Sequence, residues 1–265
     1  MKLQLVRPGT GLEWLKLGIK TFWSQPLALS ALFFLSMALM SVASMVPVIG
    51  TALALALLPM ASLVMMVAAA EALRERTPTP ALLLVAFRSG RERLRGLAVL
   101  GACYALGFGL LMLVSSAIDG GEFARVYLGL QPLTPALAQT SSFQSAMWVA
   151  MLLYLPLSLL FWHAPALIHW HGTPPLKAMF FSLVACVRNI GAFMVYGLGW
   201  MGMFILTGAV LALLIGLLST VIGTAAGALL VVAAMALAAM FFTSTVFTFR
   251  DCFAAPEAAT DSQDV

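Results

Sequence analysis

The chain has 265 residues, of which 62% are hydrophobic and only 9% are charged, and its formal net charge is +4. Average soluble domains carry about 25% charged residues, so there is too little polar surface here to coat a water-soluble globule of this size. The composition excludes a water-soluble protein and predicts a polytopic membrane protein.

Six apolar runs are long enough to cross the core of a bilayer, which takes about 20 helical residues. They cover residues 26–46, 49–70, 96–118, 145–166, 190–215 and 221–248. The last two share one uncharged stretch, whose turn we predict near Gly216 to Gly223. The first run is longer than the apolar core of a secretory signal peptide, about 7–15 residues, so we expect an uncleaved first span.

The cations are unevenly placed around these spans. Of the 14 Lys and Arg residues, all but Arg125 lie before the first span, between the second and third, between the fourth and fifth, or after the sixth. The positive-inside rule therefore predicts that both termini are cytoplasmic and that residues 119–144 form a periplasmic insertion. Within that insertion Asp119, Glu122 and Arg125 could pair with one another.

Each cytoplasmic segment contains the pattern of an amphipathic helix, with an apolar stripe and cations beside it. Thr10 to Glu13 is spaced as a capping box for the first, and Thr-Pro pairs at 79–80 and 173–174 start the others. The three stripes are Leu12, Leu15, Ile19, Phe22 and Trp23; then Leu83, Phe87, Gly90 and Leu94; then Leu176, Met179, Phe180, Leu183 and Val187. We expect these helices to lie in the membrane interface, with their cations reaching the headgroups.

The order of an interfacial helix followed by two spans recurs three times, over roughly residues 9–73, 78–168 and 173–250. Pro80–Gly96 and Pro175–Gly191 share one spacing, in which Arg93 aligns with Arg188. The predicted fold is therefore all-α: three repeats that start on the same side of the membrane, within a single integral domain over residues 1–253. Residues 254–265 are predicted to be a disordered cytoplasmic tail.

Three histidines, His163, His169 and His171, lie within nine residues and could hold a metal or serve a membrane enzyme. No Cys or carboxylate neighbours them, so we interpret them as interfacial residues and expect neither metal nor cofactor. No span carries a charge in its middle, which argues against a proton- or sodium-coupled transporter. The serines of the first span and the glycines of the last two are typical of close helix packing, and no catalytic residue is predicted.

The basic strip from residue 88 to 95 could bind nucleic acid, but beside a bilayer such a strip more often meets anionic lipid. Arg88, Arg91 and Arg95 are spaced to share one flank of a helix. We therefore predict contacts to the headgroups of anionic phospholipids, and no nucleic-acid partner. The residues predicted to make these contacts are Lys16, Lys20, Arg88, Arg91, Arg95, Lys177 and Arg188. The alternative is that these cations serve only to set the orientation of the spans in the membrane.

Three stretches carry a resemblance: Leu5 to Trp14 (LVRPGTGLEW), Phe22 to Pro26 (FWSQP) and Phe249 to Phe253 (FRDCF). They resemble uncharacterised six-helix inner-membrane proteins of Gram-negative proteobacteria, over nearly the whole chain. The resemblance implies the bacterial inner membrane but no activity or binding residues. The layout is more loosely similar to the membrane domain fused to some glycerophosphodiesterases; no catalytic domain accompanies it here, so that activity is not carried over.

These observations leave three functions open. We favour a non-enzymatic scaffold or lipid-interacting protein. The alternatives are a transporter or facilitator for an uncharged or amphipathic solute, and a membrane enzyme that uses the three histidines. A homo-oligomer or an unidentified membrane partner is compatible with each of the three.

Overall fold

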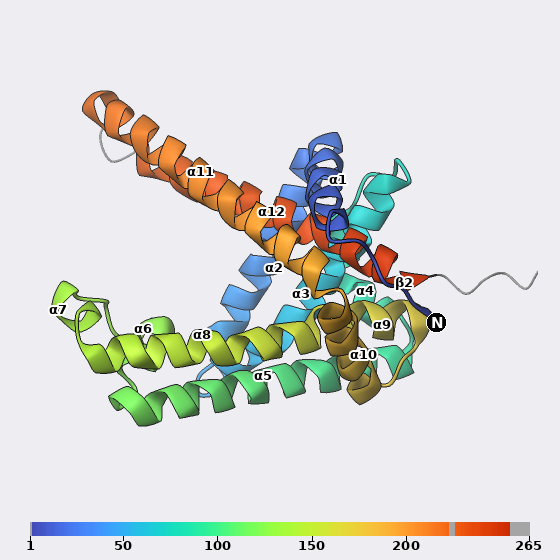
Figure 1. Cartoon of the computed structure of the whole chain (residues 1–265), viewed down its shortest axis with the longest axis horizontal. Helices are drawn as coiled ribbons and strands as arrows, with labels where there is room; N and C mark the ends of the chain where they lie inside the picture. Colours follow the sequence, from blue (N-terminus) through green and yellow to red (C-terminus); the bar gives the residue numbers. More distant parts are fainter. Residues whose placement is uncertain (1, 223–225, 255–265) are drawn as a thin grey trace, which may run out of the picture. The chain divides into compact units, whose positions relative to one another are not determined.

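The computed structural model describes residues 2–222 and 226–254. The chain is all-α apart from two short paired strands (Figure 1). In chain order the elements are β1 (Lys2–Leu3), α1 (Thr10–Ser24), α2 (Pro26–Ser44), α3 (Gly50–Leu73), the 3₁₀ helix η1 (Pro80–Leu84), α4 (Val85–Arg88), α5 (Arg91–Asp119), α6 (Glu122–Tyr127), α7 (Pro135–Ala138), α8 (Ser141–Phe161), α9 (Ala164–His171), α10 (Pro175–Arg188), α11 (Ile190–Ile222), α12 (Ala226–Cys252) and β2 (Phe253–Ala254).

Six helical segments in the described part of the chain are long and apolar enough to cross a membrane, so the predicted number of spans is confirmed. They are α2, α3, α5, α8 continued by α9, α11 and α12. α11 runs on to Ile222, past the predicted start of the turn at Gly216. A single glycine inside a helix costs only about 1 kcal/mol, so the helix continues through Gly216 among its apolar neighbours. Residues 223–225 and the predicted tail from 255 onward lie outside the described residues.

The chain folds as two compact units, which are described separately below. Unit 1 consists of Met1–Leu39, Ala61–Ser89 and Val184–Val265, and unit 2 of Met40–Met60 and Gly90–Leu183. The boundaries pass through α2, α3 and α10. They therefore do not follow the borders of the three predicted repeats.

In unit 1, α1 packs against both α11 and α12. Trp14 is completely buried on the packed face. Added Cβ atoms at Gly11 and Gly18 would collide with the carbonyl of Ala192 and with Ser244, so the helices approach at their glycines. Small residues allow such approach in membrane proteins.

The buried face of α1 differs from the predicted stripe. It is formed by Gly11, Trp14, Leu15, Gly18, Thr21 and Phe22. Leu12 and Trp23, which we predicted to belong to the stripe, are exposed. The prediction counted only apolarity, whereas the side facing the protein is selected by close packing at glycines.

The predicted capping box at Thr10 is wrong. Gly9 is the N-cap of α1, and no side chain caps the helix. Thr10 is already helical, and its N–H donates to the carbonyl of Arg7 while that of Gly11 donates to Pro8. Backbone carbonyls of the preceding turn therefore satisfy the first N–H groups, and the Thr10 side chain is not needed for that purpose.

The single basic helix predicted over Pro80–Gly96 does not form. η1 and α4 end at Arg88, and the chain turns at Gly90, where φ is +89°. Glycine adopts this conformation without steric cost. Arg91 then begins α5, the third span. Arg88 is thus on a different helix from Arg91 and Arg95, and the predicted common flank is lost.

α10 forms over the predicted residues, and its buried face is separate from the predicted apolar stripe. Its buried residues are small or polar: Ala178, Ser182, Ala185 and Cys186. Leu176 and Phe180 of the predicted stripe are 74% and 60% exposed. In α10, as in α1, apolar residues of the predicted stripe lie on the outer surface.

In unit 2, α5 and α8 run side by side (Figure 1). Their contact is mostly apolar and aromatic; the Tyr104 and Phe161 rings meet edge to face with centroids 5.0 Å apart. The Ser115 hydroxyl donates to the carbonyl of Ala146 at 3.2 Å. An added Cβ at Gly101 would collide with the carbonyl of Ala56, which brings α3 close to α5.

A pairing among Asp119, Glu122 and Arg125 is absent from the ion pairs of the described residues. The Asp119 carboxylate instead accepts the N–H groups of Gly121 (2.9 Å) and Phe123 (2.6 Å). Arg125 donates to the carbonyl of Gly120 and to the side chain of Gln131, both at 3.2 Å. The carboxylate is used to start α6, because the N–H groups of a helix start need acceptors.

Candidate functional site

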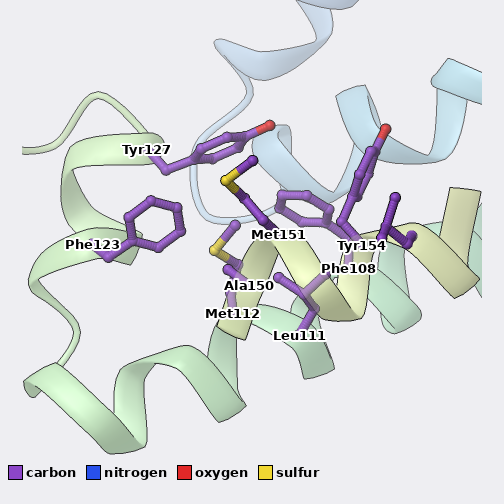
Figure 2. Close-up of a pocket in the computed structure, with 9 residues that line it drawn as sticks. Phe108, Leu111, Met112, Phe123, Tyr127, Ala150, Met151 and Tyr154 are labelled. Atoms are coloured by element: carbon purple, nitrogen blue, oxygen red, sulfur yellow. The ribbon is translucent and has the colours of Figure 1, made fainter. Parts of the chain in front are cut away.

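An apolar cavity of about 220 Å³ lies in unit 2, between α5, α6 and α8 (Figure 2). Its large side chains are Phe108, Met112, Phe123, Tyr127, Met151 and Tyr154. Ala150 lines it as well, and contributes the smallest side chain. Apolar walls with a few polar atoms are typical of small-molecule sites.

α6 covers this cavity because of the turn that precedes it. Gly120 and Gly121 both have positive φ, +69° and +85°, which reverses the chain at the end of α5. Phe123 and Tyr127 are four residues apart on α6 and therefore lie on one face. Figure 2 shows the ring of Tyr127 above Met151 and the ring of Phe123 beside the methionines of α5 and α8. The ring of Tyr127 lies 5.6 Å from that of Phe108, measured between centroids.

Tyr127 contributes a neutral hydroxyl to this region. Burial, with a smaller effect from Tyr154, raises the pKa of its phenol. The group is therefore protonated at neutral pH, where it both donates and accepts hydrogen bonds. The sequence predicted an insertion at residues 119–144 and no site there. The four-residue spacing of Phe123 and Tyr127 was the one local pattern that could have indicated this cavity.

All of the predicted headgroup-binding residues are exposed. They are Lys16 and Lys20 on α1, Arg88 on α4, Arg91 and Arg95 on α5, and Lys177 and Arg188 on α10. None of them takes part in the ion pairs found among the described residues. Those pairs join Arg74 and Arg76 to Glu71, at 3.6 and 3.7 Å, and Arg250 to Asp251, at 2.7 Å.

Unit 2 brings part of this set together. An added Cβ at Gly96 would lie 3.2 Å from Ile168 and 3.7 Å from Pro175, so the start of α5 lies beside α9 and the start of α10. Arg91, Arg95 and Lys177 therefore occupy one end of the unit. Lys16, Lys20, Arg88 and Arg188 belong to unit 1.

The three histidines occupy different environments. His163 is completely buried before α9, enclosed by protein side chains. Its N–H donates to the hydroxyl of Ser182 at 2.9 Å, and that hydroxyl donates to the carbonyl of Leu159 at 2.7 Å. This bond ties α8 and α9 to α10. His169 and His171 are partly exposed at the end of α9. Among the described residues, no group of three His, Cys, Asp or Glu side chains is placed to hold a metal.

A polar cluster in unit 1 joins the two ends of the chain, and sequence reasoning missed it. The Asn189 side chain accepts the N–H of Val6 at 2.9 Å and donates to the carbonyl of Gln4 at 3.1 Å. Trp14 Nε1 donates to the carboxylate of Asp251 at 2.8 Å. β1 and β2 pair in antiparallel register beside these bonds. We call this arrangement the terminal clasp; it joins the first and the last of the three stretches that carried the resemblance.

The comparisons with known proteins give one informative match. The chain is 37% identical over 262 residues to a probable inner membrane protein of Burkholderia thailandensis, across 97% of this chain and 96% of that protein. The chain belongs to this family of inner membrane proteins. The resemblance to inner-membrane proteins of proteobacteria is thereby confirmed. No protein-family model and no solved structure matches the chain, and the looser likeness to glycerophosphodiesterase membrane domains has no support among these matches.

In an inner membrane protein, the exposed apolar side chains of unit 2 can contact the lipid tails of the bilayer. Leu110 and Leu113 on α5 and Leu152 on α8 are exposed large hydrophobic residues. Such side chains are stable in contact with lipid tails, which are as apolar as leucine itself. The surface around the cavity of unit 2 is therefore suited to lipid.

Proposed function

We propose that this inner membrane protein is a non-enzymatic, lipid-interacting protein that binds the headgroups of anionic phospholipids through exposed cations. One observation carries the proposal. The seven predicted cations are all exposed and outside the ion pairs of the described residues, whereas Arg74, Arg76 and Arg250 are paired with carboxylates. Cations without a carboxylate partner are available to phosphate groups.

Exposed apolar residues beside the cations support an interfacial position. Phe87 precedes Arg88, and Leu176 precedes Lys177; both apolar side chains are exposed. In this proposal α10 and the segment η1–α4 lie at the boundary between headgroups and acyl chains, with their charged groups reaching outward. α1 takes the same position through Leu12 and Trp23, while its opposite face packs on α11 and α12.

The break at Gly90 changes the geometry of the proposal. Arg91 and Arg95 lie in the first turns of α5, whose N-terminus carries a partial positive charge. Each cation near an anionic surface is worth about 1 kcal/mol, so this end of unit 2 gains roughly 3 kcal/mol from Arg91, Arg95 and Lys177. The start of α5 replaces the continuous basic helix as the centre of headgroup binding.

Topology and repeats belong to the same proposal. The distribution of cations supports cytoplasmic termini and a periplasmic segment 119–144. The element order supports three repeats, because α1, η1–α4 and α10 each precede two long helices. In this arrangement the headgroup-binding cations all face the cytoplasmic leaflet.

The test compares two double substitutions that remove the same charge. We expect Arg91→Gln with Arg95→Gln to lower the phosphatidylglycerol and cardiolipin that co-purify in mild detergent, as read by native mass spectrometry. Arg74→Gln with Arg76→Gln is the matched control, because Glu71 already balances part of that charge.

Reporter fusions after Arg76 and Pro175 check that orientation is retained in each variant. Equal lipid loss in both variants would contradict a specific site. Undiminished anionic lipid in the first variant, with orientation retained, would leave the arginines as topology signals only.

A further inference from the structure

We propose that the cavity beneath α6 binds one hydrocarbon chain of a membrane lipid. The site lies at the opposite end of α5 from Arg91 and Arg95. The two proposed sites can therefore be tested independently of each other.

The size and chemistry of the cavity favour a hydrocarbon over water. Apolar cavities of about 150 Å³ remain dry and bind small hydrocarbons, and this one measures about 220 Å³. Its walls are aromatic rings and aliphatic or thioether side chains, among them Met112 and Met151. Methionine adapts its shape to irregular ligands, as a flexible chain requires.

The cavity opens onto the surface that faces lipid. Three of its lining residues, Met151, Leu155 and Tyr127, are 53%, 59% and 59% exposed. The residues next to this opening are apolar, including exposed Leu152. A chain of a surrounding lipid can therefore enter sideways from the bilayer, without crossing a polar barrier.

The cavity has one polar side. Figure 2 shows the hydroxyl oxygens of Tyr127 and Tyr154 on the side of the cavity away from Met112 and Leu111. Arg125 is two residues from both Phe123 and Tyr127, so it projects from the opposite face of α6 and does not line the cavity. The apolar side, with Met112 and Leu111, therefore receives the hydrocarbon chain.

Site-resolved photolabelling tests this assignment. The full chain is placed in nanodiscs of phosphatidylethanolamine and phosphatidylglycerol, with a phosphatidylglycerol that carries a diazirine in one acyl chain. After illumination, mass spectrometry maps the labelled residues. We expect labels on Met112 and Phe123, in addition to exposed residues such as Leu110 and Met151. Labels confined to outward residues in the wild-type protein would overturn the proposal without any variant.

Ala150→Leu narrows the cavity. The added side-chain atoms take up volume that the chain needs, so we expect cavity labels to fall about tenfold, while labels on Leu110 and Leu152 are unchanged and report that the variant is folded. Ala117→Leu is the matched control, since Ala117 is exposed on α5 and does not line the cavity. Cavity labels that persist in Ala150→Leu would contradict the assignment.

Discussion

α1 of unit 1 and α8 of unit 2 each pack against long apolar helices, but by different means. α1 meets α11 and α12 through glycines, and the clasp beside it bonds Trp14 to Asp251 and Asn189 to the N-terminal segment. α8 meets α5 through aromatic and aliphatic side chains, and leaves a cavity of about 220 Å³. Because lipid tails solvate apolar side chains, specific bonds and close packing decide helix association in a membrane. Unit 1 therefore has one defined packing, whereas unit 2 retains space that a ligand can fill.

The largest expected effect comes from breaking the clasp at Asn189, which is 3% exposed. Asn189→Leu leaves the N–H of Val6 and the carbonyl of Gln4 without their partner. Each unsatisfied buried group costs about 1–3 kcal/mol, so we expect a loss of roughly 3 kcal/mol. Thermal unfolding in detergent measures it.

Thr243→Val is the control for that substitution. Thr243 is also buried, and its hydroxyl donates to the Ala239 carbonyl of its own helix. Its replacement should change stability by less than about 0.5 kcal/mol. Equal losses in both variants would show that the clasp has no special role.

The sequence predicted the spans and missed the clasp for a physical reason. A span needs only an unbroken apolar run, so the number of spans and their approximate ends can be predicted from the sequence. Asn189 and Val6 are 183 residues apart, and no local pattern pairs them. The stripe of α1 is divided, with Leu15 and Phe22 buried against protein and Leu12 and Trp23 exposed, because apolar residues in a membrane protein face lipid as readily as protein.

The break at Gly90 had a signal that was overlooked. Ser89-Gly90 is a dipeptide typical of turns, and its presence argued against one helix over Pro80–Gly96. The cavity, by contrast, depends on the volume that packed side chains leave unfilled. That volume is not encoded in residue spacing, so only the aromatic pair Phe123 and Tyr127 could have pointed to it.

A smaller effect should come from the glycine contact of unit 1. Gly18→Ala places a methyl group against Ser244, and overpacking of this kind costs about 1–3 kcal/mol. Gly197→Ala on α11 is the matched control, because an added Cβ there meets open space. That change should raise stability by up to about 1 kcal/mol through helix propensity. The two substitutions therefore differ in sign, and a stabilised Gly18→Ala would contradict the close approach.

The smallest stability effect is expected in unit 2. Ala150→Leu adds apolar atoms to a cavity, and cavity filling commonly raises stability by about 0.5–2 kcal/mol. In delipidated detergent we expect a gain near the lower end of that range. Ala117→Leu, on the exposed side of α5, should leave the unfolding temperature unchanged. A loss of more than about 1 kcal/mol in Ala150→Leu would mean that the walls of the cavity are already close-packed.

Hydrogen exchange in nanodiscs tests the central contrast between the units most directly. Exchange of the full chain is compared between phosphatidylethanolamine alone and an equal mixture with phosphatidylglycerol. The account predicts slower exchange at residues 88–95 in the mixture, where anionic lipid binds, and no change at residues 4–10 of the clasp. Unchanged exchange at residues 88–95, or protection confined to residues 4–10, would contradict it.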